Sequence, residues 1–171
     1  MLLITSCSAP VAPPPTTARP ALPVAVPTVR ATPPVAAVSN NRGDWRAWPV
    51  TAGEWVYRRD GRGSIALFGL PGRDAAMTLR CDSAARRIYL SRQGSGTAAM
   101  TVRTSSVARV LRVAPTGGTP AYVAVALAPT DPLLDAMGFS RGRYVMEQAG
   151  APPLVVPARP EILRVAEDCR G

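Results

Sequence analysis

From residue 53 onward, hydrophobic residues alternate with polar ones in short segments, a pattern typical of strands that bury one face. Met77, Leu79 and Cys81 alternate with polar residues, and Ile88 and Leu90 repeat the pattern further along. Turn-forming pairs separate the segments and favour hairpins between them. The segments expected to form strands are 53–59, 63–69, 75–81, 86–92, 98–104, 107–113, 121–128 and 142–148, with a short one at 153–156.

Two segments depart from this alternation and favour helices. Asp131 can cap a short helix that ends at Gly138. A second helix is expected at 161–168, where Ile162 and Val165 share one face. The pattern predicts a mainly β domain, an antiparallel sandwich or partly open barrel with two short helices, the last of them C-terminal.

The start of the chain has a different composition. Residues 8–40 contain nine Pro and eight Ala, and no acidic or aromatic residue. Proline runs favour extended polyproline geometry and cannot form helix or sheet ladders. The chain of 171 residues therefore divides into a remnant of a lipoprotein signal at 1–7, a disordered Pro/Ala-rich tether at 8–40 and a single β-rich domain at 41–171.

The segment Ile4-Thr5-Ser6-Cys7 resembles the bacterial lipobox, in which an aliphatic residue and two small residues precede a cysteine that becomes acylated. The resemblance implies a lipid anchor on Cys7, and Ser8 in place of an acidic residue points to the periplasmic face of the outer membrane. A secretory signal also needs a basic start and an apolar run of about 7–15 residues. We therefore expect the reading frame to extend upstream of Met1, and the alternative is a chance match of a short motif.

The two other cysteines are expected to form a disulfide. If Cys7 carries lipid, Cys81 and Cys169 remain as an even pair in an oxidising compartment, where disulfides persist. Closing so long a loop removes roughly 4–5 kcal/mol of unfolded-state entropy. The alternative is two unrelated buried thiols. A metal site is disfavoured, because two cysteines without histidine fall short of the usual four zinc ligands.

The composition excludes much catalytic chemistry. The 20 basic residues are all arginine, and the chain has no Lys and no His. There is thus no imidazole base and no Ser–Lys dyad, and no cofactor is expected. Carboxylate pairs such as Glu54 with Asp60, or Asp131 with Asp135, keep a carboxylate-dependent envelope hydrolase as the alternative to a non-catalytic module.

A net charge of +9 favours attraction to anionic partners. Arginines gather around the first two expected hairpins, where they could form an anion-binding face. The members of this group are Arg58, Arg59, Arg62, Arg73, Arg86 and Arg87. The expected partners are the membrane, through the lipid anchor, and an envelope protein or anionic glycan, whereas nucleic acid is not favoured. The alternative is a solvated face whose arginines reflect GC-rich codons.

Four aromatic residues, Trp45, Trp48, Trp55 and Tyr57, lie close together at the start of the domain. They could stack on a sugar ring or a base. Packing against the sheet is the favoured interpretation, because aromatics make up only 5% of the chain and a small domain needs them in its core.

The segments Asp131-Pro132-Leu133-Leu134-Asp135-Ala136-Met137 and Val165-Ala166-Glu167-Asp168-Cys169 carry a further resemblance. With a Leu-x-Cys strand and a last helix that carries the partner cysteine, the chain is similar to small exported alphaproteobacterial proteins of the invasion-associated-locus-B type and to certain type VI secretion accessory proteins. The resemblance implies an exported accessory module and no particular activity. The sequence thus predicts a non-catalytic envelope module, either structural or binding a partner or anionic glycan.

Deleting residues 1–40 should leave the thermal unfolding midpoint nearly unchanged, because this segment offers little apolar surface to a core. Differential scanning calorimetry of the full chain and of the truncated chain measures the difference. A clear drop in the midpoint would mean that Val24, Val26 or a neighbour pairs with the sheet.

Overall fold

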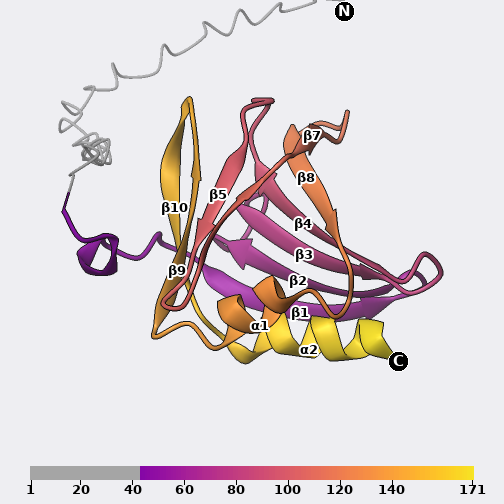
Figure 1. Ribbon diagram of the computed structural model, residues 1–171. Helices are drawn as coiled ribbons and strands as arrows, with labels where there is room; N and C mark the ends of the chain where they lie inside the picture. The colour runs from indigo at the N-terminus through magenta and orange to yellow at the C-terminus, as the bar shows by residue number, and fades with distance from the viewer. Residues whose placement is uncertain (1–42) are drawn as a thin grey trace, which may run out of the picture. The chain divides into compact units, whose positions relative to one another are not determined.

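The computed structural model describes residues 43–171, which form two antiparallel β-sheets and two α-helices (Figure 1). A short 3-10 helix, Trp45–Ala47, precedes them. The strands are β1 (Glu54–Asp60), β2 (Gly63–Gly69), β3 (Met77–Asp82), β4 (Arg87–Gln93), β5 (Met100–Arg103), β6 (Ala108–Leu111), β7 (Ala114–Pro115), β8 (Tyr122–Leu127), β9 (Arg143–Gln148) and β10 (Ala151–Pro157), and the helices are α1 (Pro132–Gly138) and α2 (Pro160–Arg170). The predicted mainly β fold with a C-terminal helix is confirmed, and each expected strand and helix lies close to its predicted bounds.

The strands form a sandwich of two separate sheets. The larger sheet has six strands in the order β1-β2-β3-β4-β8-β7, and the smaller has four in the order β10-β9-β5-β6. Hairpins join β1 to β2 and β3 to β4, with Asp60 opposite Gly63 and Asp82 opposite Arg87. The sequence did not predict β7, because its two residues, one of them proline, are too few to show alternation.

Alternation along β3 and β4 determines which face of the larger sheet is buried. Met77, Leu79 and Cys81 are fully buried, and so are Ile88 and Leu90. Leu79 lies opposite Leu90 and Cys81 opposite Ile88, so the cross-strand pairs form one continuous apolar layer. The residues between them face outward on the other side of the sheet.

The smaller sheet covers one end of this apolar layer. The hydroxyl of the buried Tyr144, on β9, donates to Met77 Sδ at 3.1 Å. Arg92 of β4 lies opposite Met77 and is only 4% exposed, and its guanidinium donates to the carbonyl oxygens of Met146 at 2.9 Å and of Pro152. Burial lowers the pKa of Arg92. These two hydrogen bonds tie β4 to β9 and β10 and offset the cost of burying a charge.

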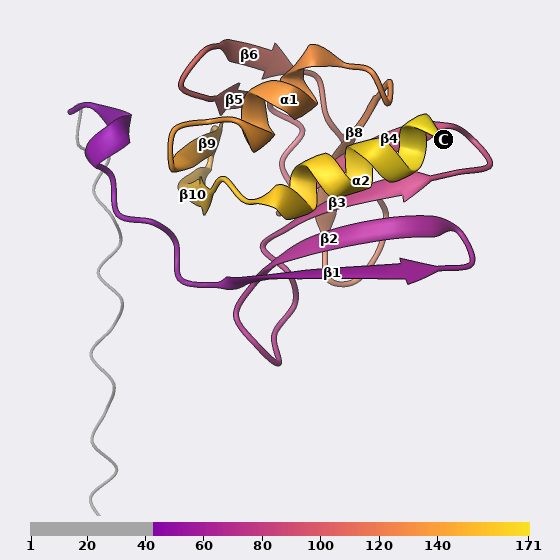
Figure 2. The same cartoon turned by 90° about the horizontal axis from the view of Figure 1, so that it is seen from below.

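The C-terminal helix covers the other end of the layer. Figures 1 and 2 show α2 lying over β2 and β3, and α1 packs beside it. The buried residues of α2 are Ile162, Val165, Ala166 and Cys169. Asp131 caps α1 as predicted, since its carboxylate accepts the Leu133 backbone N–H at 2.9 Å. Full burial of a valine or isoleucine contributes about 1.5–3 kcal/mol, so the apolar face of α2 accounts for much of its docking.

The predicted disulfide between Cys81 and Cys169 is confirmed, with Cα atoms 5.4 Å apart. It joins the end of β3 to the last turn of α2. A C-terminal helix tends to fray from its free end, and the bridge fastens that end to the sheet.

Replacing Cys169→Ser should lower the free energy of unfolding by about 2–5 kcal/mol, because it removes the constraint on the unfolded chain. Guanidinium titration measures this loss, and hydrogen exchange should show that α2 loosens first. Cys7→Ser is the matched control and should change neither measurement. A Cys169→Ser protein as stable as the unmodified one would contradict the assignment of this bridge as a main source of stability.

Candidate functional site

Outward-facing residues of the larger sheet stand in rows across the strands, because the strands are in antiparallel register. The first row consists of Arg58, Ile65, Arg80 and Tyr89, and the second consists of Val56, Leu67, Thr78 and Ser91. This face is therefore cationic and hydroxyl-rich over β3 and β4, and apolar where β1 meets β2.

An open groove of about 610 Å³ runs over this face, and we call it the outer groove. The β2–β3 loop and the start of β8 contribute its remaining walls. Its lining residues are Arg58, Arg62, Leu67, Arg73, Asp74, Ala75, Thr78, Arg80, Tyr89, Ser91, Thr116, Tyr122 and Ala124. Four arginines and one aspartate line the outer groove, and its charge therefore depends on which arginines are paired with carboxylates.

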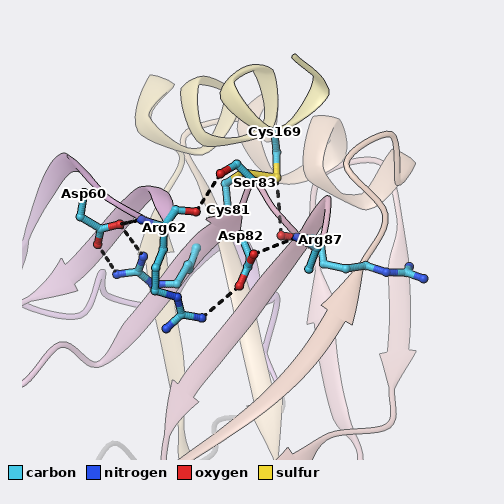
Figure 3. A network of polar contacts seen from close by, with 9 residues as sticks. Asp60, Arg62, Cys81, Asp82, Ser83, Arg87 and Cys169 are labelled. Carbon is cyan, nitrogen blue, oxygen red and sulfur yellow. Dashed lines mark hydrogen bonds and ion pairs between the residues drawn. A yellow bond between two sulfur atoms is a disulfide. The ribbon is translucent and has the colours of Figure 1, made fainter.

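Two of the four arginines are held by aspartates at the hairpin turns (Figure 3). Arg80 binds Asp60 in a bidentate pair, with N–O distances of 3.1 and 2.8 Å, and Arg62 donates to Asp82 at 3.1 Å. The hydrogen bond from Arg80, aided by the Arg62 backbone N–H, lowers the pKa of Asp60 to about 2. The Ala85 backbone N–H, followed by Arg62, lowers the pKa of Asp82. Both carboxylates thus stay ionised and fix the positions of their arginines.

The other two arginines, Arg58 and Arg73, are exposed and form no ion pair within residues 43–171. Arg73 ends the turn Leu70-Pro71-Gly72-Arg73, and its backbone N–H donates to the Leu70 carbonyl at 3.1 Å. Proline at the second position and Gly72, with φ 71°, at the third fit a type II turn. The turn thus places a free guanidinium at the rim of the groove.

The loop that carries Arg73 is anchored to the far side of the groove. The hydroxyl of Tyr122, on β8, donates to the Ala75 carbonyl at 2.6 Å. Burial raises the pKa of Tyr122, and the charge of Asp74 raises it further, so the hydroxyl keeps its proton. At Gly69 a side chain would lie 3.0 Å from Ala75 Cα, which explains glycine where the loop leaves β2.

The structure brings together three of the six arginines expected to form an anion-binding face, Arg58, Arg62 and Arg73. Arg59 lies on the opposite side of β1, where it pairs with Asp168 of α2. Its hydrogen bond to the Tyr57 hydroxyl, together with Asp168, raises its pKa.

The remaining two expected arginines lie at the β3–β4 turn, away from the groove. Arg86 donates to the Arg170 carbonyl at 3.2 Å, near the end of α2. The exposed side chain of Arg87 points away from the aspartate network (Figure 3). Half of the arginines that cluster along the chain therefore line the groove, and Arg59 and Arg86 instead contact α2.

Two of the four clustered aromatics pack against the core. The Trp55 ring lies 5.5 Å from that of Phe68, and its N–H donates to the Pro157 carbonyl at 3.0 Å. The Tyr57 hydroxyl donates to Asp168 at 2.5 Å, and the Arg164 guanidinium lies over the Tyr57 ring. Trp45 and Trp48 lie half-buried in and beside the short 3-10 helix.

The carboxylates considered for hydrolysis mostly have structural partners. Asp60 is paired with Arg80, and Asp131 caps α1 and lies 2.5 Å from Arg109. Asp135 pairs with Arg170 at 3.0 Å. Within residues 43–171, no three His, Cys, Asp or Glu side chains gather in a way that could hold a metal ion.

Charge clustering did not single out the floor of the groove, which consists of Thr78, Arg80, Tyr89 and Ser91. The signal was present in the alternation itself, because these residues occupy the outward positions between the buried ones of β3 and β4. Tyr122 left no such signal, since its role depends on β8 lying beside β4.

Asp60 should make the fold more sensitive to acid. Folding lowers the pKa of Asp60 from 3.8 to about 2, so its ionised carboxylate stabilises the folded state at any pH above 3.8. This contribution is lost as the pH falls from 3.8 through about 2. We therefore expect the urea concentration at the unfolding midpoint to decrease as the pH is lowered from about 4 to about 2, and to decrease less in Asp60→Asn. Glu167→Gln, which removes an exposed carboxylate from α2, is the control, and an equal acid response in both variants would contradict the prediction.

The lipidation site expected at Cys7 lies outside the described residues. Neither helix within 43–171 is long and apolar enough to cross a membrane. No protein-family model, curated protein or solved structure matches the chain.

Proposed function

We propose that this protein is a non-catalytic module of the cell envelope that binds an anionic ligand, such as an acidic glycan, in the outer groove. The observation that carries the proposal is the position of Arg58 and Arg73, two exposed guanidinium groups without ion-pair partners among residues 43–171, on the rim of one groove. A guanidinium group binds carboxylate or phosphate through two parallel hydrogen bonds, so the pair suits such a ligand.

The floor of the groove supports a ligand that also carries hydroxyl groups. Thr78, Ser91 and Tyr89 add neutral donors and acceptors beside Arg80. Asp60 fixes Arg80 in place before any ligand arrives, and groups held in this way lose less entropy on binding. A few fixed polar groups in a concave surface are typical of small-molecule and sugar sites.

Three features support the envelope as the compartment. The Cys81–Cys169 disulfide is of a kind that persists in oxidising compartments. The lipobox resemblance at Cys7 and the proline-rich segment after it fit a domain tethered to a membrane.

The proposal of a non-catalytic role follows from composition and pairing. The chain contains no His or Lys that could act as a base. Asp60, Asp131 and Asp135 hold arginines, and the lowered pKa of Asp60 makes it a poor general acid.

The double variant Arg58→Gln/Arg73→Gln should bind an oligogalacturonate probe at least tenfold more weakly than the unmodified chain. The reason is that a hydrogen bond to a charged group contributes roughly 1.5–3 kcal/mol, about tenfold or more in affinity. Isothermal titration calorimetry at two salt concentrations measures the loss, and the affinity should fall as salt rises.

The matched control is Arg141→Gln/Arg159→Gln, which removes the same charge from exposed positions outside the groove. It should bind as the unmodified chain does. Equal weakening in both double variants would reveal non-specific attraction to net charge, and no binding of oligogalacturonate or pyrophosphate would overturn the proposed function.

A further inference from the structure

We propose that the natural ligand is an anionic amphiphile, a molecule whose acidic head lies in the outer groove and whose hydrocarbon chain lies in an apolar recess beside it. This inference rests on the proposed function, because it names the ligand class of the same groove. It commits to a single bound molecule, rather than to docking of the domain on a membrane surface.

The apolar recess is continuous with the outer groove. It encloses about 230 Å³ and is formed by the outward face of β1 and β2 and by the turn after β2. Val56, Leu70 and Pro71 belong to the recess alone, whereas Arg58, Leu67, Arg73 and Ala75 line both spaces. The two hollows are therefore adjacent and share a boundary, and we call them together the channel.

Two apolar side chains of the recess, Val56 and Leu70, are more than half exposed to water, and a bound apolar group would cover them. Val56 is 54% exposed and Leu70 is 52% exposed. Single exposed apolar residues are common on protein surfaces, but these two line one recess next to a cationic groove. A hydrocarbon chain in this recess would remove both side chains from water.

The arginines without ion pairs stand where the two spaces meet. Arg58 and Arg73 both line the boundary, so an anionic group bound between them has the apolar recess on one side. The hydroxyl-bearing floor around Tyr89 lies on the other side. A ligand that fits would place its hydrocarbon chain in the recess, its negative charge between Arg58 and Arg73, and any further polar groups over the floor around Tyr89.

The two carboxylates near this boundary do not occupy it. Asp74 lines the outer groove, where its charge acts on Tyr122, and Glu54 lines the recess from the start of β1. Asp60 and Asp82 neutralise Arg80 and Arg62, so the positive charge available to a ligand is that of Arg58 and Arg73 at the boundary.

A second apolar recess on the molecule lacks this combination. It lies between α1 and the start of β6, encloses about 480 Å³ and includes the exposed Phe139. Its arginine, Arg109, is already paired with Asp131 at 2.5 Å. Of these two recesses, the one on the larger sheet joins an apolar wall to guanidinium groups that have no acid partner among residues 43–171.

The test uses calorimetry to compare the binding of three probes to the full chain: monododecyl phosphate, inorganic phosphate and dodecyl maltoside. The two dodecyl compounds are kept below their critical micelle concentrations. Monododecyl phosphate should bind at least tenfold more tightly than either of the others, because only it engages both parts of the channel. Shortening its chain should weaken binding by up to roughly fourfold for each methylene group lost from the recess.

Matched variants separate the two parts of the channel. Val56→Thr/Leu70→Thr should weaken the binding of monododecyl phosphate about tenfold and leave that of inorganic phosphate unchanged. Val50→Thr/Val110→Thr changes two apolar residues of similar exposure outside the channel and should have no effect. Thermal unfolding of each variant verifies that it is folded.

Each alternative outcome has a definite meaning. Binding of phosphate or oligogalacturonate that depends on Arg58 and Arg73, with no gain from the chain, would overturn the amphiphile and leave the proposed function standing. Equal binding of dodecyl maltoside and monododecyl phosphate would overturn both proposals. Binding to phosphatidylglycerol vesicles without binding of monomeric monododecyl phosphate would overturn the amphiphile in favour of membrane docking.

Discussion

The apolar layer on the inner face of the larger sheet has to be shielded from water at both of its ends, and the docking of α2 shields the second end. The smaller sheet contacts the Met77 end, where Tyr144 and Arg92 form their hydrogen bonds. At the Cys81 end the layer meets α2, whose apolar face buries Ile162 and Val165. The disulfide stands at this end, where a short C-terminal helix would otherwise separate from the sheet.

Because packing takes up the inner face, the outer face is the one left open to solvent. The same strands that bury Leu79 and Leu90 present Arg80 and Tyr89 on the other side. Ion pairs at the hairpin turns, such as that between Asp60 and Arg80, stiffen this outer face without closing it. The larger sheet therefore serves as a rigid floor, and rigid floors favour binding because little order has to be created when a ligand arrives.

The arginines of β1 show that neighbours in sequence can lie on opposite faces of a sheet. Arg58 and Arg59 are adjacent, yet alternation sends Arg58 to the groove and Arg59 toward Asp168 of α2. A group defined by closeness along the chain therefore combined arginines that line the groove with arginines that contact α2. Assigning the strand first and the charges second would have separated them, because a strand alternates its side chains between two environments.

The sequence by itself determined the elements other than β7, their order and the buried face of β3 and β4, because alternation, turn residues and helix caps are local. It also indicated the disulfide, since an even pair of cysteines at the end of a strand and of a helix has few other uses in an oxidising compartment. Only the tertiary structure decided that β8 lies beside β4 and that Tyr122 thereby reaches the loop of Arg73. It likewise decided which arginines have acid partners, because such pairs join residues far apart in the chain, and no local pattern encodes the distance between them.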